Sequence, residues 1–324
     1  MRSVVVGLLA LALTACGGAD ARDEARVASA APQQDAGGCE VFSEDNYWHA
    51  DVSGLPRHPR STQWLRRMSP TSRLHPDFGP SYGDGPNYGM PVTVVKHAHR
   101  RVRVRFLYAS ESDRVRYPFG RDTLIEGGRS SSGDKHAIVV DRGVCRLYET
   151  WNTRVRDGRW RAGSGATWRL DSNALRTDGW TSADAAGLPI LPGLLRWREV
   201  KNRNVDHAIR FTTDVTSRWH VWPARHDAGS RDSHKFPPMG ARFRLKAGYQ
   251  PPKGLGAGAR EVVRAMKTYG LVLADNGSPW FFQGERNRAW PDRLVADLKR
   301  IPASAFVAVD TRPLMVDRDS AQVQ

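Results

Sequence analysis

The amino-acid sequence predicts a mainly β protein, with an antiparallel β-sandwich or jelly-roll-like body and two or three short helices. Many short segments after residue 90 alternate apolar and polar side chains, as half-buried strands do. Segments rich in Gly, Pro, Asn and Asp separate them, and helical spacing appears mainly late in the chain. No repeat of about 20–50 residues is visible, which argues against a propeller or a solenoid.

The predicted strands lie between residues 91 and 245. The clearest alternation is at 101–106, where three arginines alternate with two valines and a phenylalanine. The segments 137–140 and 144–148 flank the turn Asp141-Arg142-Gly143 and are predicted to form a β-hairpin. Further strands are expected at 91–95, 168–170, 207–211, 219–222 and 241–245.

Helical spacing is confined to three short segments. Between 258 and 269 the apolar residues recur at spacings of one, three and three, and Gly270 favours a helix end directly afterwards. A second helix is expected to begin at Pro291 and to end before Pro302, and a third is expected at 64–68.

The N-terminus predicts export and lipid anchoring. Arg2 precedes the apolar segment 4–13, and the order Leu13-Thr14-Ala15-Cys16-Gly17 resembles the lipobox of bacterial lipoproteins. Residues 1–15 are therefore expected to be a lipoprotein signal peptide, with Cys16 lipidated and holding the protein on a membrane. The alternative is an ordinary secretory signal. Gly17, by resemblance to Gram-negative lipoproteins, favours the outer membrane of the cell envelope.

Three segments are expected after the signal peptide. Residues 16–38 are small and polar and predict a flexible tether, residues 39–316 a single β-rich globular domain, and residues 317–324 a polar tail that frays. With Cys16 lipidated, Cys39 and Cys145 are the remaining thiols, and an exported chain is expected to join them in a disulfide. The alternative is two separate buried thiols.

Composition and missing motifs exclude several function classes. A chain with 40% hydrophobic and 26% charged residues is globular rather than disordered. Without a P-loop, GxGxxG, HExxH, GxSxG or EF-hand motif, nucleotide hydrolysis, Rossmann redox, common zinc-protease and α/β-hydrolase chemistry are not expected. No cofactor or metal is assigned. The segment His97-Ala98-His99 is interpreted as a solvated basic loop, because Lys96 and Arg100 disfavour a bound cation.

Between Leu74 and Val307 the chain resembles a family of secreted bacterial proteins known as sequences rather than as a described enzyme. The resemblance lies in 74–79 (LHPDFG), 125–128 (IEGG), 133–136 (GDKH), 179–189 (GWTSADAAGLP), 207–212 (HAIRFT), 238–240 (PMG) and 269–277 (YGLVLADNG). It implies secretion and assigns neither a reaction nor a catalytic residue.

The first candidate site is the group Glu126, Asp134 and His136, where a Gly-rich loop enters an apolar strand. Carboxylates beside an imidazole are the groups that acid–base or metal-assisted chemistry needs. The alternative is structural: Asp134 caps a turn and His136 donates to a backbone carbonyl.

Other candidates lie on later loops and strands. Asp184 lies in a loop of small residues that lets the backbone approach a ligand closely, although a tightly packed turn is an equal alternative. His207 shares a strand face with apolar residues and is nearly as well explained as a core histidine, whereas His226 follows a strand break. Glu149 is a reserve acid. Asp275 and Asn276 are interpreted as a turn.

Tryptophan is unusually common, at 11 residues against 10 phenylalanines, and its face stacks well on sugar rings. Trp180, Trp222 and Trp280, with Arg225, are therefore candidate substrate-binding residues, although core packing explains most tryptophans. Trp197 lies beside similar polar segments.

The net charge of +15 favours anionic glycans, phospholipid headgroups or other acidic envelope components as partners, and no motif suggests nucleic-acid binding. The leading hypothesis is a membrane-tethered, carbohydrate-active hydrolase that uses two carboxylates. The alternatives are a non-catalytic glycan- or envelope-binding lipoprotein and a metal-assisted hydrolase using Asp134, His136 and His226. All of them assume that loops at one rim of the scaffold bring Glu126, Asp134, His136, Asp184 and His226 together.

Overall fold

The structure is a computed structural model that describes Met1, residues 35–83 and residues 87–324. The predicted signal peptide, Cys16 and most of the tether lie outside the described residues. Within the described ranges, no helix is both long enough and apolar enough to span a membrane.

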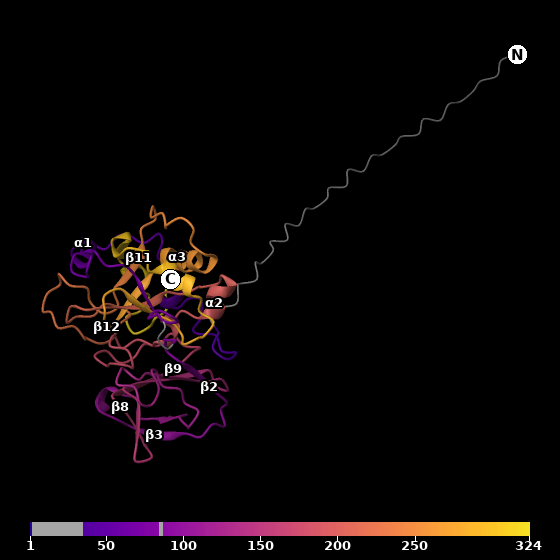
Figure 1. The fold of residues 1–324 in the computed structure, drawn as a ribbon, viewed down its shortest axis with the longest axis vertical. Helices are drawn as coiled ribbons and strands as arrows, with labels where there is room; N and C mark the ends of the chain where they lie inside the picture. Colours follow the sequence, from indigo (N-terminus) through magenta and orange to yellow (C-terminus); the bar gives the residue numbers. More distant parts are fainter. Residues whose placement is uncertain (2–34, 84–86) are drawn as a thin grey trace. The chain divides into compact units, whose positions relative to one another are not determined.

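Strands dominate the body and form three sheets (Figure 1). The first has the order β1 (His75–Asp77), β13 (Phe281–Gln283), β10 (Ile209–Thr213), β12 (Leu271–Asn276), β11 (Arg242–Leu245) and β14 (Phe306–Val309). The second has the order β2 (Val92–Val95), β5 (Ala137–Asp141), β6 (Arg146–Trp151) and β9 (Ser164–Arg169). The third has the order β4 (Arg116–Tyr117), β3 (Val102–Phe106), β8 (Arg159–Ala162) and β7 (Arg154–Arg156).

The helices are short, as predicted. They are α1 (Ser61–Leu65), α2 (Trp197–Asn202), α3 (Ala257–Thr268) and α4 (Asp292–Leu298). The 3-10 turns are η1 (Tyr47–His49), η2 (Ala109–Glu111), η3 (Leu191–Gly193), η4 (Ala303–Ala305) and η5 (Arg312–Leu314). Helix α3 packs its Val262 and Met266 side against the first sheet, and Gly270 follows it with φ of 75°, the conformation that favours glycine after a helix. Helix α2 has no counterpart among the expected helices.

The prediction of a β-rich fold is confirmed, but the prediction of purely antiparallel sheets is wrong. Strands β10 and β12 are parallel, as are β1 and β13, β2 and β5, and β3 and β8. Strand β10 is buried along its whole length, as strands covered on both faces are. The apolar–polar alternation of its sequence therefore did not indicate a half-exposed strand.

Several local predictions are confirmed. Strands β5 and β6 form the expected antiparallel hairpin, in which Ala137 lies opposite Thr150 and Asp141 opposite Arg146. The Cys39–Cys145 disulfide is present and fastens the start of the body to the turn of that hairpin. By contrast, the segment 219–222 is not a strand, since it contributes one isolated bridge, from His220 to Met239.

Unlike the frayed tail that the sequence suggested, the last residues are packed against the body. The Val323 amide donates to the Asp45 carbonyl, the Ala321 carbonyl accepts from the Tyr47 amide, and the side chains of Ala321 and Val323 are buried.

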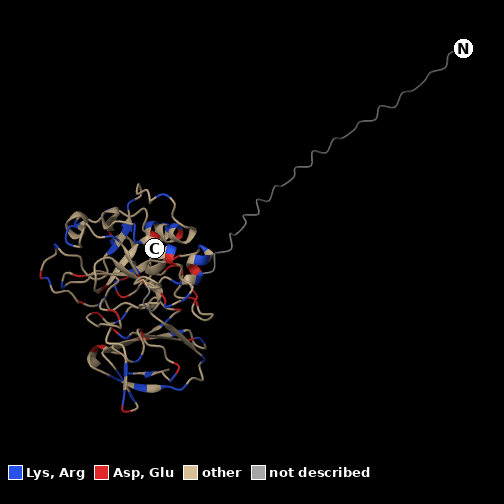
Figure 2. Ribbon diagram, viewed as in Figure 1, with Lys and Arg blue, Asp and Glu red and all other residues tan. Residues whose placement is uncertain are grey.

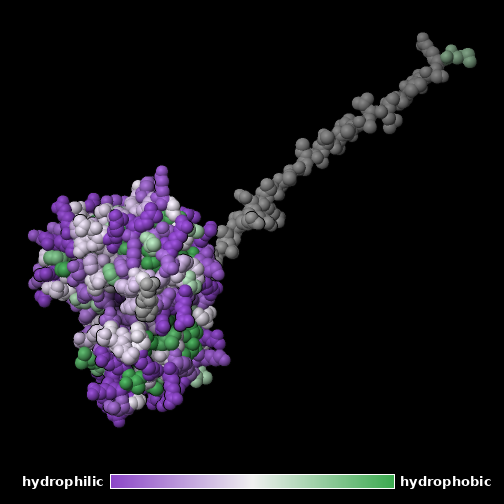
Figure 3. Space-filling view, in the orientation of Figure 1, coloured by the Kyte–Doolittle hydropathy of each residue, from purple (hydrophilic) through white to green (hydrophobic). Residues whose placement is uncertain are grey.

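The apolar side chains gather inside, and the face drawn in Figure 3 is mostly hydrophilic with small hydrophobic patches. The larger core cluster contains Trp280, stacked on Phe211 with ring centroids 5.4 Å apart. A smaller cluster around Tyr117 and Trp160 fills the space between the second and third sheets.

Candidate functional site

A pocket of about 330 Å³ lies where strand ends of the first and second sheets meet the segment that follows β3 of the third sheet. Strands β6 and β12 end at it, β9 begins at it, and the small-residue loop 181–185 forms one wall. We call it the acidic pocket, and its lining residues are Tyr108, Glu111, Asp134, Trp151, Ser164, Thr181, Ser182, Ala183, Asp184, Ala185, His226, Asp275 and Asn276.

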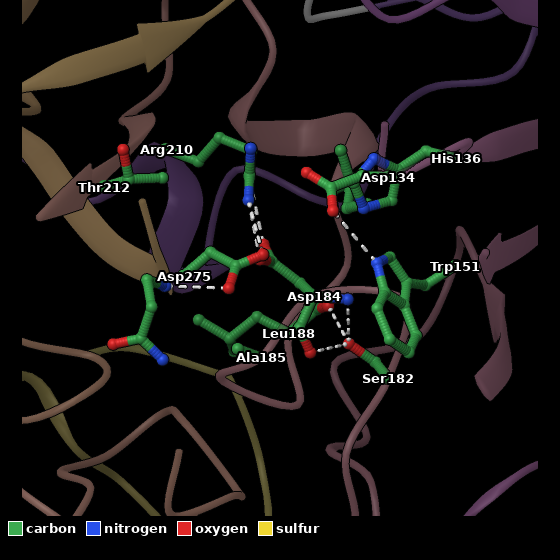
Figure 4. Close-up of polar contacts among 12 residues, drawn as sticks. Asp134, His136, Trp151, Ser182, Asp184, Ala185, Leu188, Arg210, Thr212 and Asp275 are labelled. Atoms are coloured by element: carbon green, nitrogen blue, oxygen red, sulfur yellow. Dashed lines mark hydrogen bonds and ion pairs between the residues drawn. The ribbon is translucent and has the colours of Figure 1, made fainter. Parts of the chain in front are cut away.

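At the inner wall, Asp184 forms a buried, two-point ion pair with Arg210 of strand β10 (Figure 4). Arg210 Nε lies 3.0 Å from Asp184 Oδ2 and Nη2 lies 2.6 Å from Oδ1. The Asp184 side chain is 0% exposed and that of Arg210 is 2% exposed. Fork-to-carboxylate pairs of this kind are strong and directional, so this pair fixes the orientation of the guanidinium.

The loop that carries Asp184 is held by hydrogen bonds to itself. Ser182 Oγ accepts from the Asp184 amide at 2.9 Å and donates to the Leu188 carbonyl at 2.6 Å. Gly187 has φ of 70°, and a Cβ there would lie 2.6 Å from the Trp180 carbonyl oxygen, so a larger residue would force the loop open. The loop therefore presents Asp184 from a fixed backbone.

Asp275, at the end of β12, is the acid whose protonation state is most altered. Burial raises its pKa, and the neighbouring Asp184 charge raises it further, to about 8. Arg210 Nη2 lies 3.6 Å from Asp275 Oδ2 but is already paired with Asp184. The Asp275 side chain is still 25% exposed, so the pocket presents a carboxyl group whose raised pKa favours the protonated form at neutral pH.

Behind the pocket, Glu126 and His136 form a second buried ion pair. His136 Nδ1 lies 2.6 Å from Glu126 Oε2, and the His136 backbone amide donates to the same oxygen at 3.3 Å. Burial disfavours the charged imidazole, but the Glu126 charge and hydrogen bond outweigh it and raise the pKa of His136 to about 9. Among the described residues His136 Nε2 is buried without a hydrogen-bond partner.

These two pairs balance the charges around Asp275. Arg210 compensates Asp184, and protonated His136 compensates Glu126. Burial of the Asp275 carboxyl and the nearby Asp184 charge therefore favour retention of its proton, and the charges of Arg210 and His136 oppose this only in part.

Asp134 lies on the open side of the acidic pocket, where its side chain meets an aromatic pair. Its Oδ1 accepts a hydrogen bond from Trp151 Nε1 at 3.3 Å. The Trp151 ring stacks on the Tyr108 ring, with centroids 6.4 Å apart and an interplanar angle of 28°. An exposed carboxylate beside a flat aromatic surface is suited to binding a ring with hydroxyl groups.

His226 also lines the acidic pocket and is partly exposed. Its Nδ1 is 2.8 Å from the Ala185 carbonyl, which fixes the ring against the Asp184 loop. Its Nε2 lies 3.7 Å from Glu111 Oε2, and both side chains line the acidic pocket.

The structure brings three of the five residues on which the functional hypotheses depend into the acidic pocket, and it buries the other two outside the pocket lining. Asp134, Asp184 and His226 line the acidic pocket, while Glu126 and His136 form the buried ion pair next to it. Asp134 and His136 are two positions apart in the chain. The Asp134 side chain lines the acidic pocket, and the His136 side chain is buried behind it.

Other candidate residues lie away from the acidic pocket. His207 is fully buried, with its Nε2 3.2 Å from Glu199 Oε2, and belongs to the packing around α2. Arg225 is buried and donates to the carbonyls of Arg176 and Arg318, so it fastens loops together. Glu149 accepts from the Ile190 and Leu191 amides at 2.8 Å each, and burial raises its pKa to about 7.

The three candidate tryptophans also lie elsewhere. Trp280 is in the core and donates to the Met68 carbonyl, and Trp222 packs edge-on against Tyr47 and donates to the Ser320 carbonyl. Trp180 lines a separate pocket of about 300 Å³ together with Trp168, where both rings flank the Arg176 guanidinium.

Sequence reasoning missed Arg210, Asp275 and the aromatic pair. Asp275 was interpreted as a turn residue because Asn and Gly follow it. Its position directly after a continuously apolar segment was the available signal, since such buried strands often end at a site. Tyr108 lies shortly after the predicted strand 101–106, and Trp151 lies shortly after the predicted strand 144–148, which is the same signal.

Comparisons with known proteins gave no match: no family model, no curated protein and no solved structure is similar to this chain. The parts of the chain that the structure describes also contain no group of three or more His, Cys, Asp or Glu side chains arranged to hold a metal ion.

Proposed function

We propose that the acidic pocket is the active site of a carbohydrate-active hydrolase that cleaves glycosidic bonds with a pair of carboxyl groups. The observation that carries this proposal is that one pocket is lined by two carboxyl groups in different environments: Asp275, which is largely buried and has a pKa raised to about 8, and the solvent-exposed Asp134. Two carboxyl groups in different environments are what glycoside hydrolysis requires, one to donate a proton and one to act as base or nucleophile.

In this proposal Asp275 is the general acid that protonates the leaving oxygen. Asp134 is the carboxylate that activates water or attacks the sugar, and the Tyr108–Trp151 pair supports the sugar ring. Asp184 and Arg210 are positioning residues. The negative charge of Asp184 helps keep the proton on Asp275, and the Arg210 guanidinium neutralises the buried charge of Asp184.

The test is release of reducing ends from a panel of neutral and acidic polysaccharides by the purified protein. Replacing either Asp275 or Asp134 by asparagine is expected to lower the rate by about 10²–10⁴-fold, the usual contribution of a general acid or base. Asp232→Asn is the matched control, because this exposed aspartate contacts Arg218 at 3.6 Å and lies outside the acidic pocket, so its rate is expected to be unchanged.

The pH dependence adds a second readout. The acid must hold its proton, so the rate is expected to fall as the pH rises past about 8, where Asp275 ionises. Full activity of the Asp275→Asn variant, or a rate that keeps rising above that pH, would contradict the assignment.

The aromatic pair also favours a second candidate, a glycan-binding lipoprotein without catalysis. Binding of a polysaccharide with no product, unaffected by Asp275→Asn, would favour this function. A Trp151→Ala variant is expected to weaken binding in either case, so product formation is the measurement that separates them.

We further propose that the chain is a lipoprotein of the cell envelope, anchored through Cys16 to the outer membrane, and a member of the secreted family it resembles. The Cys39–Cys145 disulfide supports an oxidising compartment. In the native host, Cys16→Ser is expected to move the protein from the membrane fraction to the soluble fraction. Membrane retention of that variant would reject the anchor.

A further inference from the structure

The third sheet has a solvent-facing side made almost wholly of arginine. In β3 and β8 the exposed residues alternate with inward residues such as Val104, Phe106 and Trp160. We call this side the arginine face, and its members that form no side-chain hydrogen bond or ion pair with the residues the structure describes are Arg103, Arg105, Arg116, Arg156, Arg159 and Arg161.

The register places these cations directly opposite one another. Arg103 pairs across the strands with Arg116, and Arg105 pairs with Arg161. On the next strand Arg161 lies opposite Arg154, whose Nε donates to Asn152, and Arg159 lies opposite Arg156. The blue segments at β3 and β8 in the lower part of Figure 2 belong to this sheet.

Like charges placed directly opposite in a sheet are destabilising, and opposite charges would stabilise the same positions. No acidic residue lies within the four strands, and none of the six arginines forms an ion pair with any residue the structure describes. The sheet therefore holds a regular array of guanidinium groups with free hydrogen-bond donors. Such an array matches a polymer with repeated carboxylate, sulfate or phosphate groups.

The arginine face adjoins the acidic pocket. Tyr108 follows β3 by two residues, Ser164 follows β8 by two residues, and Trp151 precedes β7 by three residues. All three line the acidic pocket, so the same ends of three strands lead into it. From Arg105 to Tyr108 the extended chain covers only roughly 10 Å.

We propose that the arginine face is the docking surface for an acidic polysaccharide, which lies across the strands and enters the acidic pocket past the Tyr108–Trp151 pair. This rests on the proposed function and specifies its substrate class as a polyanionic glycan. The face holds the acidic groups of the polymer, and the pocket holds the bond to be cleaved.

An anionic lipid bilayer is the other large polyanion that an envelope protein meets, and the surface fits it less well. Basic residues alone attract anionic lipids only electrostatically, and binding at a bilayer interface is strengthened by apolar side chains that enter the headgroup region. The outward positions of the four strands are arginines, and the exposed apolar residues are few and lie apart from them. Val155 of β7 is 41% exposed but shares the side of Trp160, and Leu107, which is 72% exposed, lies just beyond the end of β3. A lipid surface would also leave the continuity between the face and the pocket without a role.

The test compares two triple variants of the full chain that remove the same charge from different places. The first is Arg103→Gln/Arg105→Gln/Arg161→Gln on the arginine face. The control is Arg198→Gln/Arg218→Gln/Arg293→Gln, three exposed arginines outside the third sheet. Binding is measured by titration at several salt concentrations with polygalacturonate, dextran and phosphatidylglycerol–phosphatidylcholine vesicles.

The wild type is expected to bind polygalacturonate, more weakly as salt rises, and not dextran. The arginine-face variant is expected to lose at least about tenfold in affinity, since three exposed contacts are removed, while the control loses less than about twofold. Equal loss in both variants would show that net charge alone acts, and would overturn the proposal. So would arginine-face-dependent binding to vesicles with unchanged binding to polygalacturonate.

The measurement also separates this inference from the proposed function, because binding needs no turnover. Asp275→Asn is expected to retain polygalacturonate affinity. If no polysaccharide is cleaved but binding depends on the arginine face, the docking surface stands and the hydrolase proposal fails. If the arginine-face variant cleaves an acidic polymer with unchanged KM, the docking surface fails and the hydrolase stands.

Discussion

Strands β10 and β3 both place arginine between apolar residues, yet their arginines have opposite environments. On β10, Arg210 is 2% exposed and paired with Asp184. On β3, Arg103 and Arg105 are exposed and lie opposite other arginines. The comparison teaches that alternation identifies the two sides of a strand but not what covers each side.

The difference arises from what packs on each sheet. Phe211 faces the core beside Trp280, and on the other side Gly193 lies so close to Arg210 that an added Cβ would be 2.8 Å from the Arg210 Cβ. Loop 181–185 and η3 therefore cover the side that holds Arg210, whereas no described segment covers the outward side of β3. A buried cation must have a partner, and Asp184 supplies it.

Arg210→Met is expected to have the largest effect in this comparison. It leaves the buried Asp184 carboxylate without its cation, which is expected to lower the free energy of unfolding by about 3–5 kcal/mol. Chemical denaturation of the purified protein measures this change. The matched substitution Arg105→Met on β3 is expected to change stability by no more than about 0.5 kcal/mol.

The double variant Asp184→Leu/Arg210→Met checks the cause. If the loss in Arg210→Met comes from an unpaired buried charge, removing Asp184 as well is expected to recover part of it. A double variant as unstable as the sum of the two single variants would show that packing, and not charge, explains the effect.

The Glu126–His136 pair tests the comparison through pH. The folded-state pKa of His136 is raised from 6.5 to about 9, so its contribution to stability is fully present below pH 6.5 and is lost as the pH rises through about 9. The pKa of Glu126 is lowered, although burial opposes this, so its contribution is lost as the pH falls below its usual value of 4.5.

Thermal unfolding is therefore expected to show Tm falling between about pH 6.5 and 9, and this alkaline slope is expected to shrink in Glu126→Gln, which lacks the charge that holds the proton on His136. His99, whose partner Asp122 is exposed, provides the control: His99→Gln is expected to leave the slope unchanged. An identical slope in wild type and Glu126→Gln would contradict the buried ion pair.

The sequence was informative where neighbours in the chain are also neighbours in space. The β5–β6 hairpin follows from a short turn, and helix α3 follows from local spacing and Gly270. The Cys39–Cys145 disulfide joins positions 106 apart and was predictable for another reason, because these two thiols remain once Cys16 is set aside. The parallel pairing of β10 with β12 could not be derived, because it joins segments separated by β11 and α3, which local patterns do not relate.

The candidate site shows the same limit. His136 and His207 both lie next to apolar segments, and nothing in their local sequences shows that one is paired with Glu126 near a pocket and the other with Glu199 in the packing around α2. Asp275 is similar, since its altered pKa depends on Asp184, which is 91 positions earlier in the chain. Long-range contacts decide which polar residues can react.

The smallest expected effect is the change in stability on replacing Arg105, and its sign separates the arginine face from β10. Arg105→Gln removes one of two opposing cations, so stability at low salt is expected to rise by a few tenths of a kcal/mol, about the size of an unfavourable cross-strand pair. High salt screens the repulsion, and the gain is therefore expected to disappear there. Denaturation at two salt concentrations measures it, with Arg198→Gln as the control because Arg198 lies 3.5 Å from Asp35. A salt-independent loss of stability in Arg105→Gln would mean that this arginine, like Arg210, is held by a partner.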